Sequence, residues 1–377
     1  MLTAPMKNPP WPLPGSRAPA PPAVPSAEAH DVSARIDAVA AGALFAGRAK
    51  IACLAAELFE QPHLGPLPTA RAIAGSPEVA RRMIAVANTV KYGAGIPVTN
   101  LEAATVRLGA DRARAVAVSR LIGDILAATA PAELRFDSFW RGCLVRGCLA
   151  RALAMNAQPG LAGEAMLVGM LQDVGMAPLA ALDPAAYAEI IQQSDESQLR
   201  LAILEWRSFN MNHVHVGLRL MTGWYMPTLV VEAVGRHHTN PPLGPTSDPA
   251  IRLWQIGYLV GTLPVEPSRT PAQPDATAIR LLETAFQIGP DRIGRLLQQA
   301  AEEFEDVSGM FDACVAAGGA PCDLLAPAAA ALGAGPARLT GGSPVFTGHD
   351  SHEQHQRCDD PAANREALAH ADAVSVL

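Results

Sequence analysis

The chain has 377 residues, of which 49% are hydrophobic and 17% are charged, so most of it is expected to fold around a substantial core. Its formal net charge of −7 excludes a non-specific nucleic-acid binder and a partner of acidic membranes, because both need a basic face. Six cysteines without a C-x-x-C pair favour reduced thiols. No apolar run has the length of a signal sequence or a membrane span, so we expect a cytoplasmic protein that binds neither nucleic acid nor membrane.

Residues 1–31 are expected to form a disordered, proline-rich leader, since nine prolines in residues 1–30 are incompatible with helix and sheet interiors. Helical spacing starts at about Val32. In the stretch after Ser76, apolar residues from Val79 to Val90 recur at the intervals of one helical stripe, and Gly93 suits the end of that helix. The sequence therefore predicts a helical domain that begins directly after the leader.

The same periodicity continues through the middle of the chain. Helices are expected over 99–109, 111–126, 139–155, 161–174, 184–193, 197–221, 227–238 and 248–263. Glycine, proline and asparagine separate them, and we find neither a convincing alternating strand nor an internal repeat, so the predicted fold class is all-α. We expect a helical domain over 32–263, a linker and C-terminal helical extension over 264–335, and a mostly disordered polar tail over 336–377.

Polar residues that could carry chemistry lie on three of the predicted helices. Asp173 follows an apolar helix, His213 and His215 belong to "FNMNHVHVG", and His237 and His238 end "EAVGRHH". No local spacing such as H-E-x-x-H is present, so these residues can build a metal site only if the fold brings them together. Histidines satisfied within the core, or helix C-terminal cations favoured by the macrodipole, are the alternatives.

The stretches "MLVGMLQDVGMAPLA", "HVHVGLRLMTGWYMP" and "VVEAVGRHH", in this order, resemble the HDOD domain, the regulatory branch of the HD superfamily of metal-dependent phosphohydrolases. "LGPLPTARAIAGSPEVARRMIAVANTVKYG" resembles its N-terminal helices, and the similarity covers roughly 37–263. The resemblance implies an all-α multi-helix bundle in two helical lobes, with extra C-terminal helices and disordered ends in this chain. It also implies structural roles for five motif residues, which are Asn88, Tyr92, Gly93, Trp224 and Pro227.

Three metal ligands of the catalytic superfamily are missing when its pattern is carried over to this chain. The early histidine falls at Gly142, which has no side chain, and the histidine of the His-Asp pair is Gln172, a neutral and weak ligand. The final aspartate should fall near Gly257, where no carboxylate stands. The resemblance therefore implies a degenerate site with no catalytic residue, and neither a metal nor another cofactor is expected.

Four residues of the pattern remain, and they form the candidate vestigial site or ligand pocket together with Gln172 and Gly142: Asp173, His213, His237 and His238. The resemblance implies a non-catalytic regulatory protein of signal transduction that binds other signalling proteins. A homodimer is a further possible assembly.

Two alternatives stay open for the same site. In the first, a divergent phosphohydrolase holds Mn, Fe or Zn through Asp173, His213 and His238. In the second, a sensor binds a nucleotide without hydrolysing it, which requires a cationic residue near the site. The candidates for that residue are Arg141, Arg146 and Arg236.

The tail carries a separate set of possible ligands at intervals of three residues, which are His349, His352, His355 and Cys358. All four side chains can bind zinc or nickel. Because the surrounding composition predicts disorder, we interpret the run as incidental. No G-x-S-x-G elbow, P-loop or dinucleotide-binding glycine motif accompanies it.

Overall fold

A computed structural model describes residues 34–35, 37–38, 47–59, 64–89, 96–194, 198–262, 275–311 and 325. The chain divides into two compact units, 1–339 and 340–377, and all described residues belong to the first. Within them every regular element is helical and none is a strand, which confirms the all-α prediction. No helix among them is long and apolar enough to cross a membrane. The predicted leader, the polar tail with its histidines, and Tyr92 and Gly93 lie outside the described residues.

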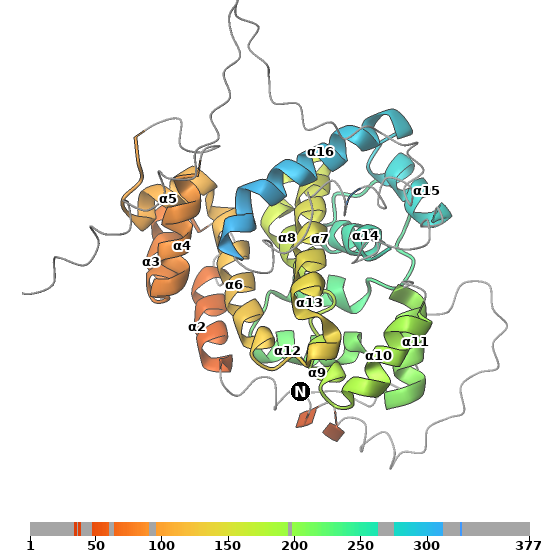
Figure 1. Cartoon of the computed structure of the whole chain (residues 1–377). Coiled ribbons are helices and arrows are strands. Elements are labelled where there is room, and N and C mark those ends of the chain that lie inside the picture. The colour runs from red at the N-terminus through yellow and green to blue at the C-terminus, as the bar shows by residue number, and fades with distance from the viewer. Residues whose placement is uncertain are drawn as a thin grey trace, which may run out of the picture. The chain divides into compact units, whose positions relative to one another are not determined.

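The N-terminal helices pack against one another and form the first group in Figure 1. They are α2 (Arg48–Phe59), α3 (Pro66–Ala74), α4 (Pro77–Ala87), α5 (Leu101–Leu108) and α6 (Ala110–Ala127). The predicted stripe of α4 is buried, including Val79 and Met83. Asn88 ends this helix, and its side-chain amide donates to the Val98 carbonyl oxygen at 2.7 Å and accepts from the Val98 amide at 2.8 Å. The motif asparagine thus fastens the end of α4 to the segment that leads into α5.

The second group is built around the long helix α7 (Phe136–Ala157), which is buried over most of its length. The other helices of this group are α8 (Ala162–Leu171), α9 (Met176–Ala180), α10 (Pro184–Gln193), α11 (Gln198–Phe209), α12 (His213–Gly223), α13 (Thr228–Gly235) and α14 (Pro249–Gly261). Two short 3₁₀ turns, η1 (Ala132–Leu134) and η2 (Pro159–Leu161), precede and follow α7. Figure 1 shows α7 and α8 side by side in the middle of this group.

Glycines let α7 and α8 approach until their backbones touch. A Cβ atom added to Gly169 would lie only 2.5 Å from the Arg146 carbonyl oxygen and 2.8 Å from Gly147 Cα. Any larger residue at position 169 would therefore push the two helices apart. This close crossing places the end of α8, where Gln172 and Asp173 follow, beside the middle of α7.

The C-terminal extension packs on the helical domain through α15 (Ala276–Ala285), α16 (Pro290–Val307) and η3 (Ser308–Met310). Helix α16 packs against α7, which it crosses at an angle in Figure 1, and buries one apolar stripe, which includes Leu296, Leu297 and Phe304. Its acidic residues pair with arginines of α6 and α7. We name this ion cluster the α16 latch, and its members are Arg112, Arg151, Glu303 and Asp306.

Candidate functional site

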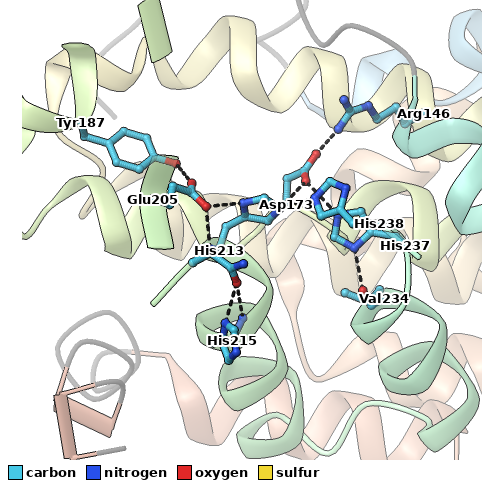
Figure 2. A network of polar contacts seen from close by, with 10 residues as sticks. Arg146, Asp173, Tyr187, Glu205, His213, His215, Val234, His237 and His238 are labelled. Atoms are coloured by element: carbon cyan, nitrogen blue, oxygen red, sulfur yellow. Dashed lines mark hydrogen bonds and ion pairs between the residues drawn. The ribbon is translucent and has the colours of Figure 1, made fainter. Parts of the chain in front are cut away.

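The fold brings residues of α7, α11 and α12 together with residues of the turns that follow α8 and α13. Figure 2 shows them around Asp173. We name this group the His-Asp centre, and its members are Arg146, Asp173, Glu205, His213, His237 and His238. Gly175 explains how the end of α8 meets the start of α12. A Cβ atom at this glycine would be 2.0 Å from the His213 carbonyl oxygen, so only glycine allows the two backbones to touch.

Arg146 and Asp173 form an ion pair in the interior of the protein. The Arg146 guanidinium donates to Asp173 Oδ2, and both side chains are only 1% exposed. Burial lowers the pKa of the arginine to about 10, so that the guanidinium remains positively charged at neutral pH. The charge of the Asp173 carboxylate is therefore balanced by the protein itself.

The second oxygen of Asp173 faces the histidines. Asp173 Oδ1 lies 3.5 Å from His213 Nε2 and 3.6 Å from His237 Nε2. His213 Nε2 lies 3.0 Å from His238 Nε2, and the three histidines have ligand atoms that all lie within 4.8 Å of one another. The structure thus brings together the four retained residues of the predicted site.

Their environment keeps two of these histidines neutral. Burial lowers the pKa of His237 to about 3, and the neighbouring His213 adds to the shift. Burial, followed by the unfavourable proximity of His237, also lowers the pKa of the half-buried His238 well below its ordinary value. His237 Nδ1–H donates to the Val234 carbonyl oxygen at 2.6 Å, which fixes the ring with Nε2 toward Asp173. Neutral imidazoles with Nε2 aimed at a carboxylate have the donor state that metal ions need.

Glu205 of α11 belongs to the centre, and the sequence interpretation missed it. Its Oε2 accepts from the His213 backbone amide at 2.9 Å and lies 2.6 Å from His213 Nδ1, while its Oε1 accepts from the Tyr187 hydroxyl at 2.5 Å. Burial, with help from Glu205, raises the pKa of Tyr187 well above 10. The missed signal was an acid at the spacing of an apolar stripe, between Leu201 and Phe209 on the buried face of α11.

The positions of the missing ligands lie on α7, at the end of α8 and on α14. Gln172 is fully buried, and neither of its amide atoms has a hydrogen-bond partner. A Cβ atom at Gly261 would lie 3.4 Å from Gln172 Nε2 and 3.3 Å from His237, whereas one at Gly257 would first meet Val168. Of the two glycines of α14, Gly261 therefore lies closer to the site. Gly142 is buried on α7, one turn before Arg146.

The other residues that were singled out from the sequence have separate surroundings. Arg236 is exposed and lies over the Trp254 ring, 5.2 Å from its centroid, so it is a surface residue beside a different aromatic group. His215 turns to Asn212, with Nδ1 at 2.6 Å from Oδ1. Trp224 is fully buried at the end of α12, and the Pro227 carbonyl accepts the first hydrogen bonds of α13. Arg141 is buried on α7.

The complete metal set of the catalytic superfamily does not fit this centre. Gly142 and Gly257 offer no donor atoms, and the orphaned amide of Gln172 is neutral. The carboxylate of Asp173 is paired with Arg146, and a guanidinium beside a divalent ion is strongly repulsive. What remains is one paired carboxylate with two buried histidines and the half-buried His238.

Comparisons with known proteins agree with this fold. The family model of the HDOD domain matches residues 49–240. The chain is similar to a candidate signal transduction protein from Marinobacter aquaeolei VT8, with 19% identity and a TM-score of 0.51 over 68% of this chain and 58% of that one. The chain is also similar to an HDOD domain protein of unknown function from Geobacter sulfurreducens, with 18% identity and a TM-score of 0.50 over 68% of this chain and 91% of that one.

A candidate metal-dependent phosphohydrolase from Shewanella amazonensis SB2B has 17% identity and a TM-score of 0.49, over 76% of this chain and 99% of that one. The structures with TM-scores of 0.50 and 0.51 show that the fold is shared. A search among curated proteins finds no match.

Proposed function

This chain belongs to the HDOD domain family, and from that premise we propose that it is a non-catalytic protein of signal transduction that works by binding other signalling proteins. The observation that carries the proposal is the buried ion pair between Arg146 and Asp173, which occupies the retained carboxylate of the centre. The protein of similar fold from Marinobacter aquaeolei is named for signal transduction, which supports the same direction. The proposal includes a cytoplasmic location, no cofactor, and a possible homodimer.

The chemistry of phosphoester hydrolysis gives the physical reason. A hydrolytic metal site needs about three protein ligands and an open position at which water is activated. Asp173 and His213 are fully buried and His237 is 1% exposed, so that a substrate cannot touch them in this conformation. The missing donors at Gly142 and Gln172 reduce the ligand set further. A protein that keeps the bundle but lacks accessible chemistry can still act through its outer surface.

Turnover and binding can be tested with the same pair of proteins. Purified wild-type protein, supplied with Mn²⁺, Fe²⁺ or Zn²⁺, should hydrolyse nucleotides and phosphodiesters no faster than an Asp173→Asn variant whose fold is verified by circular dichroism. After crosslinking in cells, both proteins should recover the same partner. Hydrolysis that the wild type shows and the variant lacks would contradict the proposal.

One observation favours the divergent phosphohydrolase as a second candidate. Donor atoms of a tetrahedral metal with bonds of about 2.0–2.1 Å are about 3.4 Å apart, and Asp173 Oδ1 lies 3.5 and 3.6 Å from two histidine nitrogens. Under this candidate, Asp173, His213 and His238 would hold Mn, Fe or Zn, which would activate water. Elemental analysis decides between the two candidates if the possible ligands of the tail are first replaced by alanine in the full-length, tag-free chain. Stoichiometric metal that disappears in an Asp173→Asn/His213→Gln variant would favour the enzyme.

The nucleotide sensor has no comparable support. It requires a cationic side chain that faces a ligand, and Arg146, the candidate that lies in the centre, is already paired with Asp173 in the interior.

A further inference from the structure

An arginine stands in the middle of a group of residues that could otherwise bind a metal. Arg146 comes from the centre of α7, and the contact between Gly147 and Gly169 holds α7 so close to α8 that the guanidinium reaches Asp173. Figure 2 shows the arginine on one side of the Asp173 carboxylate and the histidines on the other. The two oxygens of one carboxylate thus face a permanent cation and a set of imidazoles.

The donor atoms on the histidine side converge. Asp173 Oδ1 and His237 Nε2 are buried without a hydrogen-bond partner and lie 3.6 Å apart. His213 Nε2 is 3.5 Å from the same oxygen and 3.0 Å from His238 Nε2. These separations are near the value of about 3.4 Å between donors of a tetrahedral ion with bonds of about 2.0–2.1 Å. Unsatisfied buried polar atoms are rare in proteins, so a convergent pair of them points to a missing partner.

The supporting residues already orient the imidazoles as ligands. Glu205 holds His213 through Nδ1 at 2.6 Å, and the Val234 carbonyl holds His237 through Nδ1, also at 2.6 Å. A carboxylate or carbonyl on the far nitrogen of a histidine is the usual second layer of a metal site, and it leaves Nε2 free to coordinate. The rings of His213 and His237 are therefore held in the orientation of ligands, and the charge of Arg146 lies beside them.

We propose that Arg146 takes the place of a metal ion in this centre. Its positive charge holds the Asp173 carboxylate in the interior, and it keeps closed a latent divalent-cation site made of Asp173, His213, His237 and His238. The role follows from charge: a buried carboxylate needs a compensating cation, and this chain supplies it from α7. A second cation a few ångströms from the guanidinium would be repelled. Removing the charge of Arg146 should thus open the site.

The test uses Co²⁺ as the probe, in full-length, tag-free protein whose tail residues His349, His352, His355 and Cys358 are replaced by alanine. In this background, Arg146→Met and Arg146→Gln should bind a single Co²⁺ with the visible absorption of a tetrahedral ion, at least about a hundred-fold more tightly than the parent, since one repelling charge is gone. Arg146→Lys keeps the charge and should behave like the parent. Adding His213→Ala to Arg146→Met should abolish the absorption.

Thermal unfolding supplies a second measurement that does not depend on the spectrum. Co²⁺ should raise the Tm of Arg146→Met and Arg146→Gln by mass action and leave the Tm of the parent unchanged. Arg146→Gln is included because its amide can donate a hydrogen bond to the buried carboxylate, so it can fold even if Arg146→Met does not. Both variants are also refolded in the presence of Co²⁺. Tetrahedral Co²⁺ in the parent would overturn the proposal. The proposal would also be overturned if both variants fold and neither binds Co²⁺, or if neither variant folds even when Co²⁺ is present during refolding.

Discussion

Helix α7 supplies one arginine to each of two ion clusters, which differ in burial and in the number of arginines that contact each carboxylate. In the His-Asp centre, Arg146 and Asp173 are each 1% exposed, and Arg146 is the arginine paired with that carboxylate. In the α16 latch, the side chains are 10–15% exposed, and Glu303 is contacted by both Arg112 and Arg151. In the latch, two arginines share one carboxylate and the side chains are partly hydrated, whereas Arg146 and Asp173 form a pair in the interior.

The difference shows that the same chemistry serves two purposes in one helix. The latch fastens an amphipathic helix whose apolar stripe already packs on α7, so its charges only complete an interface that the hydrophobic effect forms. The centre has no such reason to be charged, because a buried ion pair is commonly no more stable than apolar residues of similar volume. Stability alone therefore does not explain why Arg146 and Asp173 are charged.

Removing one partner from each cluster is expected to give the largest contrast. Asp173→Ala removes the carboxylate that pairs with the buried Arg146 guanidinium and should lower the free energy of unfolding by about 3–5 kcal/mol. Asp306→Ala should lower it by only about 1 kcal/mol, since Arg112 keeps its bidentate contact with Glu303 at 2.5 and 2.6 Å. Urea denaturation of the two variants measures both values. Equal losses of unfolding free energy would mean that breaking the buried pair costs no more stability than breaking a pair of the latch.

The second largest difference between the two clusters is expected in how their contributions to stability depend on pH. The pKa of His237 is lowered in the fold to about 3, so below its ordinary value near 6.5 the unfolded chain takes up a proton that the folded chain refuses. Stability is therefore complete above pH 6.5 and falls as the pH drops toward 3, by up to about 1.4 kcal/mol per pH unit for this residue. His237→Gln should flatten the acid limb of stability against pH by that amount.

The matched control for this pH experiment comes from the latch, which contains no histidine. Glu303→Gln should leave the contribution of His237 to the slope between pH 6 and 5 unchanged, because the substitution does not alter this histidine. Urea midpoints measured at a series of pH values give both slopes. An unchanged slope in His237→Gln would show that this histidine does not contribute to acid unfolding.

The helices could be predicted from the sequence because periodicity reports which face of a helix is buried. The stripe of α4 is an example, since Val79 and Met83 fall at one spacing and are both buried. Periodicity does not report which helix lies opposite. The pairing of Arg146 with Asp173 depends on the glycine contact between α7 and α8, which joins residues 27 positions apart in the chain.

The candidate site was predictable only in part for the same reason. The retained and missing positions, such as Asp173 and Gln172, were recognised from their motif because they lie in short, characteristic stretches. Glu205 has no motif of its own, and its role arises when α11 folds against the start of α12. A buried acid on an apolar stripe is the pattern that should have prompted a search for its partner.

The smallest effect is expected within the latch and tests its redundancy. Arg151→Met keeps an apolar stem of similar length and removes a contact to Glu303 of 3.2 Å, while Arg112 still binds the same carboxylate. The free energy of unfolding should fall by about 1 kcal/mol or less at low salt, and the loss should shrink at high salt, because partly exposed charges are screened. The loss caused by Asp173→Ala should not shrink, since salt does not enter the interior. Urea denaturation at two salt concentrations measures both losses. A loss in Arg151→Met that does not change with salt would mean that the latch is as well shielded from water as the centre, and it would contradict the distinction between the two clusters.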